Sequence, residues 1–141
     1  MVKTESYAQV AEGLSELHNR LRRLQNQMLR EVHISLSEFH ILLLLAHRET
    51  VSQNDLAEAL DVDKALISRL TQAMVEKGLL QCRTDPDCRR RKLLSLGAGA
   101  DKLLPKLQDV HRQSLEHLFA SLEEQQLDTL QTILKGLVET L

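Results

Sequence analysis

The pattern that most constrains the fold of this 141-residue chain lies in residues 52–97. Ser52 is followed three residues later by Asp55, which is the spacing of a relaxed capping box. This pattern predicts a short helix that ends near Leu60. A three-residue turn separates it from a second helix over residues 64–77. Gly78 adopts positive φ at little cost and is predicted to end that helix. Two short helices joined by a tight turn form a helix-turn-helix motif.

The hydrophobic period changes after the second of these helices. Residues 80–84 alternate between apolar and polar side chains, Asp85-Pro86-Asp87-Cys88 supplies a turn, and residues 91–96 form a second apolar stretch. This pattern predicts a two-stranded hairpin with a basic tip. A helix-turn-helix followed by such a hairpin is the winged-helix arrangement.

Both ends of the chain are predicted to be helical, each with a narrow apolar stripe. In the N-terminal helix the stripe steps by three and four residues through Tyr7, Val10, Leu14, Leu17, Leu21, Leu24 and Met28. In the last helix it steps in the same way through Leu127, Leu130, Leu134, Leu137 and Leu141. Because a narrow stripe needs a partner helix, the two ends are predicted to assemble a dimer platform.

Two further helices are expected between these regions. One opens at residues 36–39, with Ser37 as its N-cap, and is apolar nearly all round, which predicts burial on several sides. The other runs from about residue 100 to 122, where Pro105 must lie in the first turn or mark a kink.

The predicted fold class is therefore mainly α with a small β-hairpin wing. We expect a single domain over residues 1–141, with a winged-helix lobe at about 34–97 and dimerisation helices at about 1–33 and 98–141. The chain lacks a signal-peptide pattern and an apolar run long enough for a bilayer, and it has two cysteines. These features predict a cytoplasmic protein without a membrane partner.

The charge distribution favours a nucleic-acid partner more than the formal net charge of −2 does. Residues 64–92 hold eight basic and three acidic side chains, a net charge of +5 that leaves −7 for the remainder. A localised basic patch on an acidic body is an electrostatic footprint suited to DNA. A merely solvated charged loop is the alternative explanation.

Helical geometry predicts which side of the second helix reads DNA. The side expected to face the core carries Leu66, Ile67, Leu70 and Met74. The outward side carries Lys64, Ala65, Ser68 and Gln72, with Arg69 and Thr71 beside them. Arg pairs with guanine and Gln with adenine in the major groove, whereas an ordinary solvated face is the competing interpretation. On the hairpin, Arg89, Arg90 and Arg91 are candidates for backbone or minor-groove contacts.

Four segments of this chain closely resemble the MarR family of regulators. They are SQNDLAEAL over residues 52–60, DKALISRL over 63–70, EKGLL over 76–80 and DPDCRR over 85–90. The likeness extends over essentially the whole chain in length and in the order of elements, and residues 56–96 are its most specific part.

The resemblance implies a homodimeric winged-helix regulator that binds a pseudo-palindromic site in double-stranded DNA, and most commonly a repressor. It also implies a pocket between the dimerisation and DNA-binding lobes for a small phenolic or other lipophilic effector, with no bound cofactor. The DNA contacts that it implies fall on Lys64, Ala65, Ser68, Arg69 and Gln72 of the recognition helix and on Arg89 and Arg90 of the wing.

The chain departs from the family pattern around the wing. The family usually has an Asp two residues before the arginine that matches Arg90, and Cys88 stands there. The salt bridge that this Asp would give the wing is therefore in doubt unless Asp87 substitutes for it. Gly97 replaces a Thr after the second wing strand, and Ala100 replaces a later Gly.

Other functions find less support in the sequence. Cys88 lies beside three arginines and is predicted to be an exposed, oxidation-prone thiolate, with Cys82 as a candidate resolving partner. His40 and His47 share one helix face, and His111 and His117 lie on another helix, which leaves open a composite metal site between helices, although no compact ligand spacing is present. No enzyme motif is visible. The rival from another class is a winged-helix adaptor that binds proteins instead of DNA.

Overall fold

The computed structural model describes residues 2–141, and its longest element is the N-terminal helix α1 (Val2–Leu29). The other helices are α2 (Leu36–His47), α3 (Gln53–Leu60), α4 (Lys64–Glu76), α5 (Leu104–Phe119) and α6 (Glu124–Glu139), with short 3-10 turns at Arg30–Val32 and Ala98–Ala100. The strands are β1 (Val51–Ser52), β2 (Leu80–Asp85) and β3 (Cys88–Leu96). The fold is mainly α with a hairpin wing, as the sequence predicts. Among the described residues, no helix is long and apolar enough to cross a membrane.

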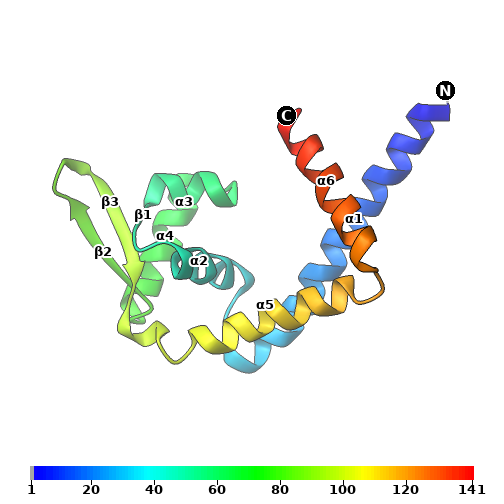
Figure 1. The fold of residues 1–141 in the computed structure, drawn as a ribbon. Coiled ribbons are helices and arrows are strands. Elements are labelled where there is room, and N and C mark those ends of the chain that lie inside the picture. Colours follow the sequence, from blue (N-terminus) through cyan, green and yellow to red (C-terminus); the bar gives the residue numbers. More distant parts are fainter. Residues whose placement is uncertain (1) are drawn as a thin grey trace.

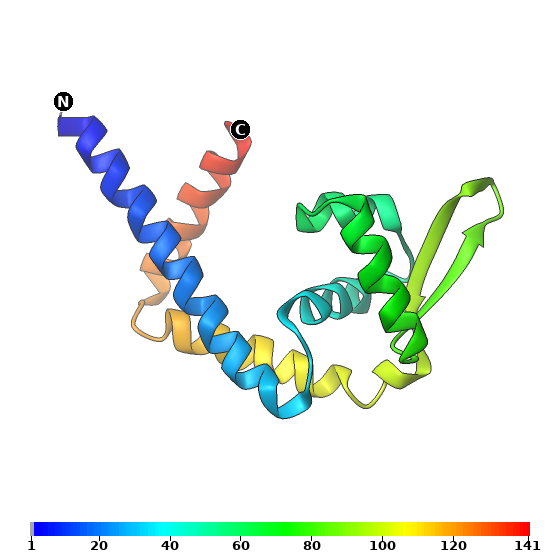
Figure 2. The same ribbon diagram turned by 180° about the vertical axis from the view of Figure 1, so that it is seen from behind.

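The helices and the wing are arranged as two lobes joined by α5 (Figure 1). At one end, α1 and α6 diverge from each other so that both chain termini project in the same direction. At the other end, α2, α3 and α4 pack together beside the hairpin of β2 and β3. Helix α5 runs along the base and packs against both α1 and α2, and Figure 2 shows the same arrangement from behind.

The sheet is antiparallel and has the strand order β1-β3-β2. The hairpin of β2 and β3 confirms the predicted wing, with Leu80 opposite Leu96. The sequence did not indicate β1, because two residues are too short to show a period. It pairs Val51 with Leu94, and this pairing fastens the wing to the start of α3.

Helix α2 lies at the centre of the core, which confirms its predicted burial. The core residues that it contributes are Leu36, Phe39, Ile41, Leu42 and Leu45. They pack with apolar residues from the surrounding helices and strands, among them Leu56, Ile67, Met74, Leu94 and Leu107. Because Phe39 is the only buried aromatic residue of the described chain, aliphatic side chains provide almost all of the packing.

The helix caps agree with the sequence at two positions and differ at one. Ser52 caps α3 and Asp63 caps α4, each by accepting a hydrogen bond from a backbone N–H three residues on. The prediction of Ser37 as the cap of α2 is wrong, because Ser35 holds that position. The reciprocal capping box needs Glu38 at the third helical position, and only Ser35 has that spacing.

The junction between the wing and α5 is tighter than the sequence suggests. The predicted helix from about residue 100 begins at Leu104, so Pro105 lies in its first turn, where its missing N–H costs little. Before it, the Gly97 N–H donates to the Leu79 carbonyl oxygen over 2.8 Å. A Cβ on Gly97 would lie far inside van der Waals contact with the carbonyl oxygen of Gly78, so only glycine fits there.

Candidate nucleic-acid interface

Helix α4 is oriented by three side chains that are buried along one face. These are Ile67, Thr71 and Met74. The predicted core face is wrong at Leu66, which is 42% exposed, and the predicted flanking position of Thr71 is wrong because that residue is fully buried. The true core axis follows the spacing of four and three residues through Ile67, and Leu66 lies about 100° away from it.

Burial of Thr71 is stabilised by hydrogen bonds. Its hydroxyl donates to the carbonyl oxygen of Ile67 over 2.7 Å and accepts from the Gln53 side-chain amide over 3.3 Å. The second bond links the first residue of α3 to the middle of α4. Since a buried hydroxyl without partners would cost free energy, this pair both permits the burial and fixes the angle between the two helices.

The predicted reading face of α4 is on the surface. The residues that form it, all exposed, are Lys64, Ala65, Ser68, Arg69 and Gln72. Asp63 caps the helix just before this face, with 2.8 Å between its Oδ1 and the Leu66 backbone nitrogen. The helix therefore presents an ordered N-terminal turn, small side chains and a guanidinium in one place, which suits close approach to a major groove.

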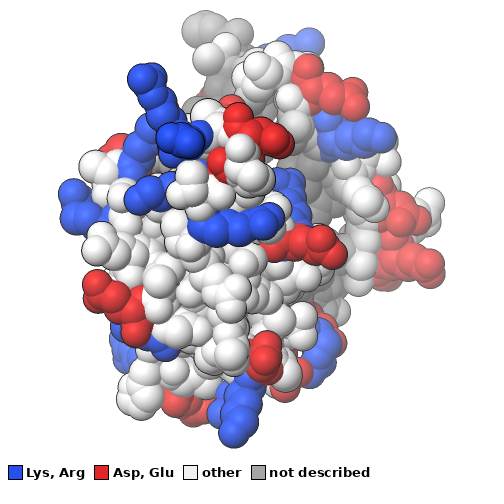
Figure 3. All heavy atoms as spheres, turned by 90° about the vertical axis from the view of Figure 1, so that its left-hand side faces the viewer, with Lys and Arg blue, Asp and Glu red and all other residues white. Residues whose placement is uncertain are grey.

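The three wing arginines lie where the strand ladder is irregular. Asp85 is opposite Cys88, whereas Thr84 is opposite Lys92, so the three residues 89–91 have no partner residue on β2. A bulge of this kind re-aims side chains away from the regular ladder. All three arginines are exposed. Figure 3 shows that Lys and Arg side chains gather on the upper part of the face that carries the wing.

The wing is held by Arg91, and not through Asp87. The Arg91 Nη2 atom donates to Asp55 Oδ2 over 3.3 Å, and its Nε lies 3.9 Å from Asp85 Oδ2. Within residues 2–141 the Asp87 carboxylate makes no ion pair, and its backbone N–H donates to Asp85 Oδ1 over 2.9 Å. Asp87 therefore does not supply the wing salt bridge that the sequence left open. Sequence reasoning missed Asp55, because it lies 36 residues from Arg91.

A cavity of about 280 Å³ lies between α4 and the wing. Its lining includes Gln53, Ser68, Gln72, Cys82 and Lys92. A second cavity, of about 270 Å³, lies between α1 and α5 and is lined mostly by leucines, together with Arg20 and His117. Both are close to the lower limit for small-ligand sites.

The two cysteines are free thiols, and both are exposed. Cys88 of β3 lies opposite Asp85 of β2, and Cys82 lies three residues before Asp85 on β2. At about 3.3 Å per residue this puts the two cysteine Cα atoms roughly 10 Å apart, beyond the ~7 Å that a disulfide allows. A disulfide within one wing would therefore require the strands to unpair.

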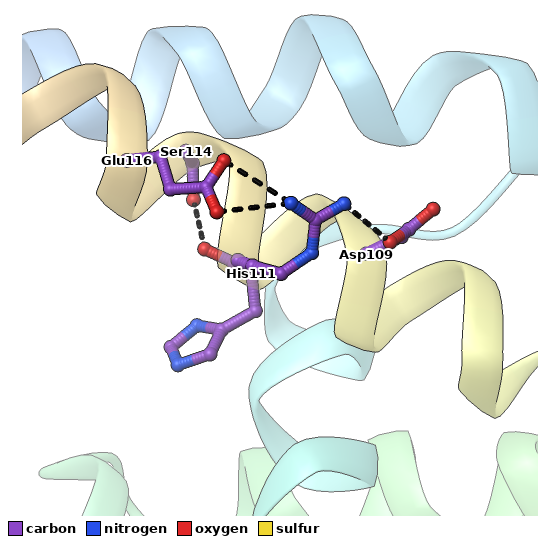
Figure 4. A network of polar contacts seen from close by, with 5 residues as sticks. Asp109, His111, Ser114 and Glu116 are labelled. Carbon is purple, nitrogen blue, oxygen red and sulfur yellow. Dashed lines mark hydrogen bonds and ion pairs between the residues drawn. The ribbon is translucent and has the colours of Figure 1, made fainter.

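The histidines that the sequence singled out lie around α2 and α5. The His111 ring packs 6.3 Å from the Phe39 ring, measured between centroids. Figure 4 shows that this ring points away from the carboxylates of Asp109 and Glu116, which bind Arg112. Desolvation, followed by the charges of Arg22, His111 and His18, lowers the pKa of His40.

Among residues 2–141, no three His, Cys, Asp or Glu side chains come together as a metal-binding group. The composite histidine site that the sequence left open is therefore not assembled within the described part of this chain.

Part of this chain is similar in sequence to known transcriptional regulators. Residues 34–92 match the sequence model of the MarR family. A transcriptional regulatory protein described for the hcr operon of Thauera aromatica is 29% identical over 99 residues, which cover 70% of this chain and 60% of the relative. An uncharacterised HTH-type transcriptional regulator of Bacillus subtilis, YdgJ, is 33% identical over 63 residues, or 45% of this chain and 38% of the relative. The matches thus span less than two thirds of either relative.

Solved structures share the fold over nearly the full length. A MarR transcriptional regulator from Methanosarcina mazei superposes with a TM-score of 0.83 at 22% identity, covering 93% of this chain and 94% of that one. A mutant MarR from Escherichia coli in complex with operator DNA has a TM-score of 0.81 at 22% identity, with coverages of 94% and 95%. BpsR of Bordetella bronchiseptica, whose DNA binding is regulated by 6-hydroxynicotinic acid, gives 0.80 at 20% identity, with coverages of 92% and 98%.

Proposed function

We propose that this chain is a transcriptional regulator of the MarR family that binds double-stranded DNA sequence-specifically as a homodimer, a proposal supported by the match of residues 34–92 to the family model. The observation that carries the proposal is the exposed face of α4, which lies beside a wing whose arginines are displaced from the strand ladder. In this proposal the protein binds DNA and does not catalyse a reaction. It acts in the cytoplasm, where a bacterial chromosome is located.

The recognition helix supplies the sequence-dependent contacts in this proposal. Arg69 lies on the exposed face and reaches guanine edges in bidentate fashion, and Gln72, one turn away, matches adenine. Lys64 and Ser68 contact bases or phosphates near the N-terminus of α4. Ala65 is small enough to allow close approach of the helix backbone.

The wing supplies contacts that depend less on sequence. Arg89 and Arg90 are exposed on the bulged segment of β3 and lie without an ion-pair partner among residues 2–141. Unpaired guanidinium groups this close together repel one another, and DNA phosphates would offset that repulsion. An arginine side chain also fits the electronegative minor groove.

The homodimer is supported by apolar side chains that one chain leaves uncovered. On α1 the N-terminal half of the stripe is exposed, at Tyr7, Val10, Leu14 and Leu17. On α6 the exposed apolar residues are Leu127, Ile133, Leu134, Leu137 and Val138. Two diverging helices with such faces suit interlocking with the same pair from a second copy (Figure 1).

Repression relieved by a small lipophilic or phenolic effector completes the proposal. The support is the regulation of BpsR by 6-hydroxynicotinic acid, carried to this chain by likeness of fold. The separation of the two DNA-binding lobes in a dimer can differ between a state that binds DNA and a state that does not. A ligand that binds the second state more tightly than the first would weaken DNA binding.

The proposal is tested by measuring affinity for fragments of the gene's own upstream region over a salt series. Arg69→Ala should weaken binding at specific sites by about 1–3 kcal/mol, and Arg90→Ala should weaken all duplexes while flattening the salt dependence. Arg112→Ala is the matched control, because that arginine is exposed on α5 and pairs only within its own helix.

An adaptor function is the outcome that would replace the proposal. A protein that shows no preference over random duplex, and no change in any of the three variants, would not be a DNA-binding regulator. The search would then turn to protein partners of the same α4 face.

A further inference from the structure

We propose that Asp55, Asp85 and Arg91 form a clamp that sets the position of the wing relative to α4, which makes Arg91 a positioning residue and not a DNA contact. The inference rests on the proposed DNA-binding function, and it differs from the sequence-based prediction, in which Arg91 is a candidate DNA contact together with Arg89 and Arg90.

The clamp joins three elements that the chain brings together only on folding. Asp55 belongs to α3, Asp85 is the last residue of β2, and Arg91 belongs to β3. The guanidinium uses different nitrogens for its two partners, Nη2 for Asp55 at 3.3 Å and Nε for Asp85 at 3.9 Å. The contact with Asp55 is a hydrogen bond and is therefore directional, whereas the contact with Asp85 is a longer ion pair that attracts the guanidinium toward β2.

Asp85 is itself held in place from both sides of the hairpin. Its Oδ1 accepts the backbone N–H of Asp87 in the turn, and its Oδ2 faces Arg91. Only 14% of this side chain is exposed, so the carboxylate is largely withdrawn from solvent. The turn and the Arg91 side chain are therefore ordered by the same group.

Asp55 is anchored to the recognition motif and to the sheet. It lies in the first turn of α3, where a carboxylate interacts favourably with the helix dipole, and its N–H donates to Ser52 Oγ over 3.0 Å. Ser52 is opposite Leu93 in the pairing of β1 with β3. The Asp55–Arg91 pair therefore links the helix-turn-helix to the wing beyond the point where the short strand β1 ends.

The charges on the bulged segment are consequently not equivalent. Arg91 is matched by two carboxylates, whereas Arg89 and Arg90 have no carboxylate at ion-pair distance within residues 2–141. Only Arg89 and Arg90 therefore remain available to bind DNA phosphates and so to release the counterions of the DNA. The clamp holds the bulge so that these two point outward.

The change in DNA affinity when Asp55 is removed has opposite signs under this proposal and under a purely electrostatic explanation. An acidic side chain close to the DNA-binding surface repels phosphates, so its loss should tighten binding if charge alone matters. If Asp55 positions the wing, its loss weakens binding instead. Asp87→Ala is the matched control, since it removes the same charge from the wing without touching the clamp.

The experiment measures duplex affinity and its salt slope for Asp55→Ala, Asp87→Ala, Arg91→Gln and Arg90→Gln. We expect Asp55→Ala to lower affinity about threefold to tenfold, from two surface pairs per dimer, and Asp87→Ala to leave it equal or higher. Arg91→Gln should lower affinity with little change in slope, whereas Arg90→Gln should reduce the slope by about 1.8 for two phosphate contacts per dimer. Asp55→Glu, which keeps the carboxylate, should restore most of the affinity.

Hydrogen exchange on the free protein gives a readout that needs no DNA. Asp55→Ala should speed amide exchange in residues 85–92 while Asp87→Ala leaves residues 89–92 protected as in the parent. Tighter binding by Asp55→Ala, or an Arg91→Gln slope loss equal to that of Arg90→Gln, would overturn the clamp. If the parent protein binds no DNA but the exchange pattern holds, the clamp stands and the proposed function fails.

Discussion

The Lys77 ammonium lies 3.3 Å from the Glu38 carboxylate and ties the end of α4 to the start of α2. The Glu38 side chain is only 8% exposed, while that of Lys77 is mostly in solvent. Burial alone would raise the pKa of Glu38, but hydrogen bonds with the backbone and side chain of Ser35, together with Lys77, outweigh it and hold the pKa below 4.5. One carboxylate thus serves both a helix cap and a contact between helices.

A pH-dependent contribution to stability follows from this lowered pKa. The contribution is fully present above the ordinary pKa of 4.5 and is lost as the pH falls through the lower folded value. Glu38→Gln retains the capping box but not the charge, so we expect it to cost about 1 kcal/mol at pH 7, with the difference from the parent vanishing in acid. Urea unfolding at fixed protein concentration over a pH series measures this, and a constant difference at all pH values would contradict it.

A buried hydrogen bond between Gln25 and Ser114 joins α1 to α5. The Gln25 amide donates to Ser114 Oγ over 3.2 Å, and the Ser114 hydroxyl donates to the His111 carbonyl oxygen. Ser114→Ala leaves the amide without this acceptor, so we expect a loss of about 1–3 kcal/mol in unfolding free energy. The double variant with Gln25→Leu should recover part of that loss, because no buried amide then lacks a partner. If the loss of unfolding free energy in the double variant equals the sum of the losses in the two single variants, Gln25 and Ser114 do not stabilise each other.

The glycine at the wing junction gives a test by steric clash. Gly97→Ala places a Cβ against the Gly78 carbonyl oxygen, and we expect it to destabilise the protein by about 1–3 kcal/mol. Gly136→Ala in α6 is the matched control, since a Cβ there meets nothing within 4 Å and a helix interior favours Ala by about 0.5–1 kcal/mol. Chemical denaturation should therefore shift the two variants in opposite directions.

The apolar faces of α1 and α6 predict what breaks the proposed dimer. Leu137 is 52% exposed in one chain, so Leu137→Glu should cost little within the subunit. In a dimer it would bury a charge twice, which we expect to raise the dissociation constant by at least about 100-fold. Gln125→Glu adds the same charge at an exposed position of α6, on the helix face opposite the apolar set. Sedimentation velocity distinguishes the two, and an unchanged mass for Leu137→Glu would exclude α6 from the interface.

Local signals in the sequence were sufficient where a short segment decides the structure by itself. Ser52 and Asp63 cap helices because each precedes a free backbone N–H by three residues, and Gly78 ends α4 with φ of 78°. The same signals failed for α2, where Ser35 and Ser37 both offer a hydroxyl. The reciprocal bond from Glu38 distinguishes them, and it forms from one spacing only.

The sequence by itself determined the order of the elements, the exposed face of α4 and the basic wing, because helical and strand periods, caps and turn residues act over a few positions. Only the tertiary structure decided that Leu66 is exposed and that Thr71 is buried, because Gln53 of another helix supplies the partner that permits the burial. It also decided that Arg91 is paired with Asp55, 36 residues away. Such contacts depend on how elements dock, and no periodicity along the chain encodes the distance between them.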